Sequence, residues 1–207
     1  MQFTNDSIGG SYGARKVILH NQHWVYKTVR AEWEVRAYEI YKALLPYKRG
    51  HWYVPETVYG PSMPDNTTTS LQAYVKDAVT YSQLYVYPCG TPPPIDPTTA
   101  AEAAAFDYLI EQSDRHEYNY LIDLAGQLVL IDHGNAFELG YASDAFRRAA
   151  PPSYCVDYWL PARGAVAAAA PEEWKADILD RFDQLPCFSI SRLDDASQAI
   201  RKAKTLP

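Results

Sequence analysis

Residues Ser113–Gly134, SDRHEYNYLIDLAGQLVLIDHG, place polar and ionisable side chains on either side of two short apolar runs. The runs NYLID and QLVLID flank LAGQ, in which a glycine supplies the conformational freedom of a tight turn, so the stretch predicts a β-hairpin. Asp114, His116 and Asn119 then lie at its entry, and Asp132 lies at its exit. Because the two ends of a hairpin meet, we expect Asp114, Asn119 and Asp132 to lie close together.

Oxygen-bearing side chains at one strand end suit a hard cation, and Mg²⁺ prefers oxygen ligands together with waters and phosphate oxygens. In phosphoryl transfer by kinases, an Asp positions the substrate hydroxyl and an Asn after four intervening residues holds one Mg²⁺. An Asp two residues before a Gly, across a hairpin, holds the other. Asp114, Asn119 and Asp132 reproduce this spacing. The spacing predicts that Asn119 and Asp132 are metal ligands and that Asp114 is catalytic.

The rest of the chain predicts a protein with two lobes. Short runs rich in β-branched and aromatic residues on both sides of HNQH predict a hairpin over residues 17–29, and WYVPETVYG and SLQAYVKDAVTYSQLYVY predict further strands. Between these lies a helix, predicted over residues 31–45 and stopped by Pro46. Its apolar stripe consists of Trp33, Ala37, Ile40 and Leu44.

The proline-rich segment PCGTPPPIDP, residues 88–97, predicts a lobe boundary because prolines remove hydrogen-bond donors and disfavour helix at the preceding residues. Beyond it, Thr99 and Glu102 predict a capping box at the start of a helix. SDAFRRAA, PEEWKADILDRFDQL and SRLDDASQAIRKAK predict more helix, and ARGAVAAAAP is either a helix or a loop. We therefore expect a bilobal α+β fold, with a β-rich N-lobe over residues 1–90 and a mostly helical C-lobe over residues 91–207.

Composition narrows the functional classes. The 207 residues include 47% hydrophobic and 21% charged residues, as in ordinary globular proteins, and a net charge of -6 gives no general basic field for nucleic acid. No apolar run approaches the roughly 20 residues that span a bilayer, and MQFTNDSIGG lacks a signal-peptide core, so we expect a cytoplasmic protein. Cys89, Cys155 and Cys187 are too few and too widely spaced for a disulfide framework or a zinc finger.

The sequence DRHEYN followed by LIDHG resembles the catalytic and metal loops of atypical kinases. This group comprises the phosphatidylinositol 3- and 4-kinases, the HipA-like kinases and their small bacterial relatives. His133 stands where ordinary kinases have the Phe of DFG, and His116 follows Asp114 where an ordinary kinase has a His before its catalytic Asp. Both departures suit the atypical group. The resemblance implies a protein-kinase-like fold with a shortened C-lobe, and it implies that ATP and Mg²⁺ are bound.

The same resemblance implies a phosphate-gripping Lys in the N-lobe and a Glu that holds it. Lys27 in WVYKTV stands in a strand, as the Lys of VAIK does in kinases. At about 100° per residue, Glu34 borders the apolar stripe of the helix, whereas Glu32 and Glu39 point largely away from it. We therefore expect Glu34 to be the partner of Lys27, with both residues in the catalytic site.

Two further segments complete the implied nucleotide site. The small residues of GGSYGA would let backbone N–H groups approach the ATP phosphates. Residues 71–75 would supply adenine contacts, those nearest the hinge being residues 74–76. The predicted cofactor-binding residues of these segments are Gly9, Gly10, Ser11, Tyr12, Gly13, Tyr74, Val75 and Lys76.

The resemblance implies transfer of the γ-phosphoryl group of ATP to a hydroxyl of a protein Ser/Thr or of a small molecule, and nucleotidyl transfer stays open. His116 either takes part in catalysis or braces the loop by hydrogen bonds, and Arg115 is expected to brace it. Two other classes remain. A metal-dependent hydrolase would use the Asp and His side chains at positions 114, 116, 132 and 133. A noncatalytic, kinase-like module would bind nucleotide only.

Overall fold

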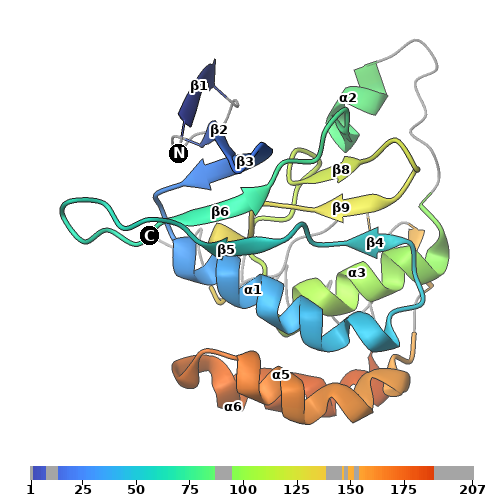
Figure 1. The fold of residues 1–207 in the computed structure, drawn as a ribbon. Coiled ribbons are helices and arrows are strands. Elements are labelled where there is room, and N and C mark those ends of the chain that lie inside the picture. The colour runs from blue at the N-terminus through green and yellow to red at the C-terminus, as the bar shows by residue number, and fades with distance from the viewer. Residues whose placement is uncertain are drawn as a thin grey trace, which may run out of the picture.

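The computed structural model describes residues 2–7, 14–86, 95–138, 146, 149–151 and 154–188. Within these residues the chain forms two β-sheets, with helices packed beneath them (Figure 1). The first sheet is antiparallel and has the order β1 (Gln2–Ser7), β2 (Arg15–Leu19), β3 (Gln22–Lys27), β6 (Ser70–Ala73) and β5 (Thr57–Tyr59). The second has the order β4 (Trp52–Tyr53), β9 (Leu128–Leu130), β8 (Tyr120–Ile122) and β7 (Val79–Thr80), and only the β4–β9 pairing is parallel among them.

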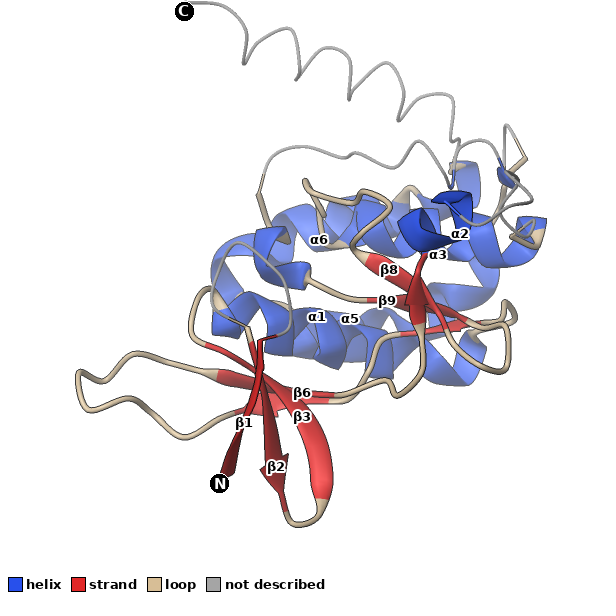
Figure 2. Ribbon diagram, turned by 90° about the horizontal axis from the view of Figure 1, so that it is seen from above, coloured by secondary structure: helices blue, strands red, loops and turns tan. Residues whose placement is uncertain are grey.

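The hairpin predicted around HNQH is confirmed as β2 and β3. Its turn residues His20 and Asn21 have φ of 51° and 64°. Positive φ at both turn residues matches the right-handed twist of the flanking strands, which explains a short polar turn here. Lys16 pairs with Val25, so by strand alternation Lys16, Val25 and Lys27 share one face of the sheet. Figure 2 shows this hairpin extending away from the helices.

Helix α1 (Ala31–Leu44) is also confirmed. Ala37, Ile40 and Leu44 of its apolar stripe are fully buried, and Trp33 is partly buried against the same core. Pro46 lies inside a single 3₁₀ turn that continues the helix to Tyr47. The helix lies between β5 on one side and α5 (Arg163–Ala169) on the other (Figure 1). This position fixes the helix against both the sheet and the helical layer.

The prediction of strand for SLQAYVKDAVTYSQLYVY is wrong in its last third, where helix α2 covers Tyr81–Val86. Thr80 explains the difference. Its hydroxyl accepts a hydrogen bond from the Gln83 backbone N–H at 3.2 Å, and the Gln83 side chain accepts one from the Thr80 N–H at 2.8 Å. This reciprocal pair is a capping box, and the letters T-x-x-Q carried its signal.

The predicted capping box at Thr99 and Glu102 is wrong. Helix α3 (Pro97–Leu109) is capped by Asp96, whose side chain accepts from the Thr99 N–H at 2.9 Å. The fully buried Glu102 instead accepts hydrogen bonds from two backbone donors before β4, from one side chain of β4 and from a tyrosine of the C-terminal part. These donors are the backbone N–H of Arg49 (2.9 Å), the backbone N–H of Gly50 (2.8 Å), Trp52 Nε1 (2.8 Å) and the Tyr158 hydroxyl (2.7 Å). Glu102 therefore ties α3 to the second sheet.

The C-terminal part is helical, as predicted. The Ala-rich segment forms α5, and PEEWKADILDRFDQL forms a 3₁₀ turn followed by α6 (Lys175–Asp183). Most of SDAFRRAA and all of SRLDDASQAIRKAK lie outside the described residues. The main core joins α1, α3, α5, α6 and the β8–β9 hairpin around Trp52, Phe106 and Trp159.

The boundary expected between residues 90 and 91 also lies outside the described residues and stays a prediction. The chain enters the second sheet before that point, because β4 and β7 pair with β9 and β8. In the described part of the chain, no helix has both the length and the apolar character needed to cross a bilayer.

Candidate active site

The hairpin predicted within Ser113–Gly134 is formed by β8 and β9, and its turn contains Gly126 with φ of 76°. At the other end, the Ile131 N–H donates to the Asn119 carbonyl at 3.2 Å. Asn119 and Asp132 therefore lie at the same end of the hairpin, as the sequence predicts. This pair of strands therefore positions Asn119 and Asp132.

A fully buried ion pair braces the loop before β8. Arg115 donates to the two carboxylate oxygens of Asp107 on α3 at 2.9 and 3.0 Å, and both side chains are 0% exposed. The same guanidinium donates to the carbonyls of Asn119 and Ile131, the latter at 2.7 Å. Arg115 thus has the bracing role expected of it. It holds both strands of the hairpin where the site residues begin.

Lys27 links the two sheets at this end. Its Nζ lies 2.5 Å from Glu34 Oε1 of α1 and 3.1 Å from Asp132 Oδ1 after β9. The glutamate of α1 that contacts Lys27 is Glu34. Glu32 and Glu39 instead lie near Arg36 and Lys42. The side chains of Lys27 and Glu34 are 14% and 1% exposed, whereas Asp132 is 48% exposed. One ammonium thus faces two carboxylates, and the outer carboxylate is open to solvent.

The charges of this cluster reinforce one another. Burial alone would lower the pKa of Lys27, but Glu34 and Asp132 raise that pKa above its ordinary value. Burial opposes ionisation of Asp132, yet Lys27 and, more weakly, Arg115 bring the pKa of Asp132 below its ordinary value. Both groups are therefore ionised at neutral pH. The cluster thus sets two acidic side chains against one basic side chain.

His133 packs inside the protein. Its ring is 0% exposed and stands edge-on to Phe106, with centroids 5.9 Å apart. Burial holds the pKa of His133 well below its usual value, so the ring is neutral and its 3.9 Å approach to Glu34 is not an ion pair. Asp132 before it has φ of 59°, a conformation that costs energy for a residue with a side chain. This backbone turns His133 inward while Asp132 faces Lys27.

Asp114, His116 and Asn119 lie together on the loop before β8. Asn119 Nδ2 donates to the Asp114 carbonyl at 2.8 Å and lies 3.2 Å from His116 Nε2. His116 Nε2 is also 3.7 Å from Asp114 Oδ1, and these two side chains are about half exposed. His116 contacts both Asn119 and Asp114, the predicted catalytic residue. Its two proposed roles, in catalysis and in bracing the loop, therefore both stay open.

Asn135 and Arg30 also belong to this region, and the sequence reasoning missed both. Asn135 Nδ2 donates to Asp114 Oδ2 at 3.0 Å, and Arg30 donates to the Asn135 side-chain oxygen. Asp107 was missed as well, although an acid within the apolar part of a helix is a signal that burial requires a partner. For Asn135 the only signal was its place directly after the motif that ends at Gly134.

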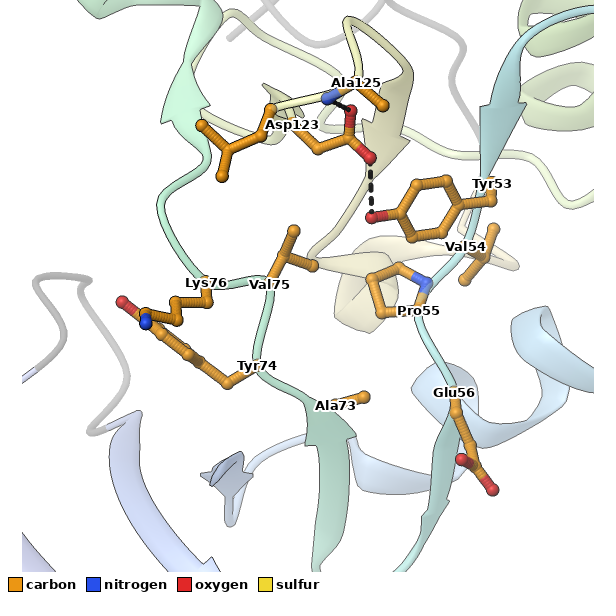
Figure 3. Close-up of a pocket in the computed structure, with 11 residues that line it drawn as sticks. Tyr53, Val54, Pro55, Glu56, Ala73, Tyr74, Val75, Lys76, Asp123 and Ala125 are labelled. Carbon is orange, nitrogen blue, oxygen red and sulfur yellow. Dashed lines mark hydrogen bonds between the residues drawn. The ribbon is translucent and has the colours of Figure 1, made fainter. Parts of the chain in front are cut away.

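Residues 74–76 follow β6, as expected for a hinge. Tyr74 and Lys76 point to one side of this segment, and Val75 points toward Val54 and Pro55 (Figure 3). The Tyr74 ring lies 4.3 Å from Lys16 Nζ, on the face of the sheet that also bears Lys27.

Residues 74–76, together with Asp123–Ala125 of the β8–β9 turn, line a pocket of about 470 Å³ (Figure 3). This pocket lies at the opposite end of the hairpin from Asn119 and Asp132. The adenine contacts expected of Tyr74, Val75 and Lys76 stay predictions, as do the phosphate contacts of Gly9, Gly10, Ser11, Tyr12 and Gly13, which lie outside the described residues.

The hydrolase alternative required a cluster of Asp and His side chains. Among the residues that the structure describes, no group of three or more His, Cys, Asp and Glu side chains is arranged to hold a metal ion. His133, one of the four side chains that this alternative needs, is fully buried in the core. The arrangement gives this alternative no support.

By its fold the chain is an α+β protein of the kinase-like class, with a β-sheet N-terminal part and a mostly helical remainder. It is similar to the crystal structure of the proinflammatory kinase CtkA of Helicobacter pylori, with a TM-score of 0.59. The superposition covers 100% of this chain and 97% of that chain at 13% sequence identity, so the likeness concerns the fold alone. No family model and no curated protein matches the sequence.

Proposed function

We propose that this protein is an ATP- and Mg²⁺-dependent phosphotransferase that moves the γ-phosphoryl group of ATP to a hydroxyl. The observation that carries the proposal is the bridge from Lys27 to Glu34 at 2.5 Å and to Asp132 at 3.1 Å. It joins a strand, a helix and the end of a hairpin, with Lys27 and Asp132 separated by 105 positions in the sequence. Such a bridge orients an ammonium toward phosphates in kinases.

The residues present fit a magnesium ion. Asp132 carries a lowered pKa and is half exposed, and Asn119 hydrogen-bonds to the Asp114 carbonyl through its Nδ2, which leaves its Oδ1 as the ligand atom we propose. These are oxygen ligands of the kind that Mg²⁺ prefers, with phosphate oxygens and waters completing its shell. When bound, the metal ion would neutralise charge that develops on the phosphoryl oxygens.

The protein groups then have separate tasks. Lys27, held by Glu34, binds phosphate oxygens of ATP. Asp114 orients the acceptor hydroxyl and takes its proton as the oxygen forms a bond to the γ-phosphorus. The bond from that phosphorus to the β–γ bridging oxygen breaks, and ADP leaves with the electron pair. His116, next to Asp114, either shares the proton or orients the carboxylate.

We assign the protein to the atypical kinases that resemble the phosphatidylinositol 3- and 4-kinase and HipA-like groups. The support is the pair of motifs DRHEYN and LIDHG, together with the burial of His133 at the position of the DFG Phe. Its partners would be the nucleotide and a hydroxyl acceptor, with no role for nucleic acid. A protein Ser/Thr and a small molecule both remain as acceptors, and a module that only binds nucleotide is the second candidate.

The test is incubation of purified protein with γ-labelled ATP and Mg²⁺, alone and with cell extract. We expect label on the protein or on an extract component, loss of label with EDTA, and no label with Asp132→Asn. Glu117→Gln is the matched control, because it removes an exposed negative charge from the loop before β8, at the same end of the hairpin as Asp132. Turnover by Asp132→Asn at the wild-type rate would refute the proposal, and ATP binding without any transfer would favour the nucleotide-binding module.

A further inference from the structure

One side chain outside the predicted motif connects the proposed catalytic Asp to the start of helix α1. Asn135 donates through Nδ2 to Asp114 Oδ2 at 3.0 Å and accepts from Arg30 through its own Oδ1. Arg30 also donates to the Gly134 carbonyl at 3.4 Å and forms an ion pair with Glu138 at 2.5 Å. The carboxamide therefore lies between a guanidinium and a carboxylate.

The backbone fixes Asn135 as firmly as its side chain does. Its carbonyl accepts hydrogen bonds from the backbone N–H of Ser113 at 3.2 Å and from the Ser113 hydroxyl at 3.0 Å. Ser113 directly precedes Asp114 in the chain. Asp114 and Asn135 are thus held together by two hydrogen bonds from Ser113 and by their own side-chain hydrogen bond, which favours one orientation of the Asp114 carboxylate.

Arg30 brings helix α1 into the same arrangement. Its φ of 53° places it in the left-handed region, and its carbonyl accepts the first helical hydrogen bonds from Trp33 and Glu34 at 3.1 and 3.4 Å. Glu34 is the residue that holds Lys27. A displacement of the start of α1 would therefore move the Lys27 partner and the Asn135 contact together.

Only a carboxamide satisfies both neighbours of Asn135. Its oxygen accepts from Arg30 while its nitrogen donates to Asp114, and each hydrogen bond has one charged partner and is therefore strengthened. An Asp side chain of the same shape would accept from Arg30 but would place a second carboxylate against Asp114. A comparison of Asn with Asp at position 135 therefore separates a role in positioning Asp114 from a role in filling space, because the two side chains have the same shape.

We propose that Asn135 is a positioning residue that fixes the Asp114 carboxylate for the acceptor hydroxyl, and that Arg30 couples it to helix α1. The inference rests on the phosphotransferase activity proposed above. With Oδ2 engaged by Asn135, the Asp114 Oδ1 atom, on the side of His116, is the one that receives the hydroxyl.

The test compares turnover, affinity for a nonhydrolysable ATP analogue and melting temperature in Asn135→Asp, Asn135→Ala, Arg30→Gly and the Arg30→Gly/Asn135→Ala double variant. We expect both Asn135 variants to lose turnover by about 100-fold, the cost of a misplaced catalytic group, with analogue affinity unchanged. Arg30→Gly suits the left-handed backbone and should lose less. The double variant should be no slower than Asn135→Ala, because the two residues act in one chain of contacts.

Glu138→Gln is the matched control, because it removes the ion pair to Arg30 and leaves the Arg30–Asn135 contact in place. Its turnover should stay near that of the wild type. Full turnover by Asn135→Asp would overturn the inference while the activity itself stood, since this variant keeps the shape of the side chain. A wild-type protein without any transfer activity would remove the proposed function and the inference with it.

Discussion

Two networks of charged side chains hold the hairpin end, and they differ in charge and in exposure. The Asp107–Arg115 pair is balanced, with one anion and one cation, and neither side chain is exposed to solvent. The Lys27 cluster has one cation for two anions, and Asp132 at its outer end is 48% exposed. The buried network is complete within the protein. The open one has more acidic than basic side chains and is partly exposed to solvent.

This difference indicates which network supports the fold and which one is available for chemistry. Arg115 uses four of its five N–H donors on Asp107 and on two backbone carbonyls, and its side chain is fully buried. Asp132 presents an ionised carboxylate at the surface of the cluster, next to an ammonium held by a buried Glu34. The buried arrangement suits a structural role, whereas the open one suits the ligand-binding role that we propose.

The same substitution in both networks sharpens the comparison most. Asp107→Asn leaves the Arg115 charge buried without its partner, which we expect to lower the free energy of unfolding by about 3–5 kcal/mol. Asp132→Asn, at a half-exposed site, should change it by less than about 1 kcal/mol while abolishing transfer. Urea unfolding of the two variants measures this difference. Equal loss of stability in both would contradict the division into a structural and a functional network.

Local patterns in the sequence predicted much of this site. The hairpin, its two polar ends and the position of Glu34 on its helix follow from the spacing of apolar residues, because such spacing fixes which side chains share a face. The burial of Trp33, Ala37, Ile40 and Leu44 followed from the same pattern. These features depend on contacts within one or two neighbouring elements.

Contacts between distant segments could not be predicted in the same way. No local pattern indicates that Arg30 meets Asn135, since both are polar residues near element ends and many such pairs are possible. Glu102 shows the same limit. Its spacing from Thr99 suits a capping box, but the fold offered it several buried donors near β4, and tertiary structure overrode the local preference.

Glu102 provides the next test, because it is a fully buried carboxylate that accepts hydrogen bonds from four uncharged donors. In Glu102→Gln, one oxygen becomes an amide nitrogen that faces donors of the segment before β4. We expect a loss of about 2–3 kcal/mol in the free energy of unfolding, with analogue binding retained. Glu173→Gln, an exposed position, is the control and should stay within about 0.5 kcal/mol of wild type. A neutral Glu102→Gln would mean that the contacts around α3 rearrange without cost.

The smallest expected effect concerns an ion pair whose exposure to solvent is intermediate between those of the two networks. Arg181 lies 2.7 Å from Glu111, and their side chains are 10% and 19% exposed. Burial raises the pKa of Glu111 more than Arg181 lowers it, so this group titrates above its ordinary value of 4.5 in the folded state. A raised pKa means that its contribution to stability is complete below pH 4.5 and is lost as the pH rises through the folded-state value.

We therefore expect the difference in melting temperature between wild type and Glu111→Gln to change by a few degrees at most as the pH rises from below 4.5 to neutral. The melting temperature of the wild type should fall relative to that of the Gln variant as the pH rises, because only the wild type must ionise a partly desolvated carboxyl group. The reverse trend would mean that Arg181 outweighs burial at this site. Glu111 would then be a stabilising partner of Arg181, and the pair would resemble the balanced Asp107–Arg115 network despite its partial exposure.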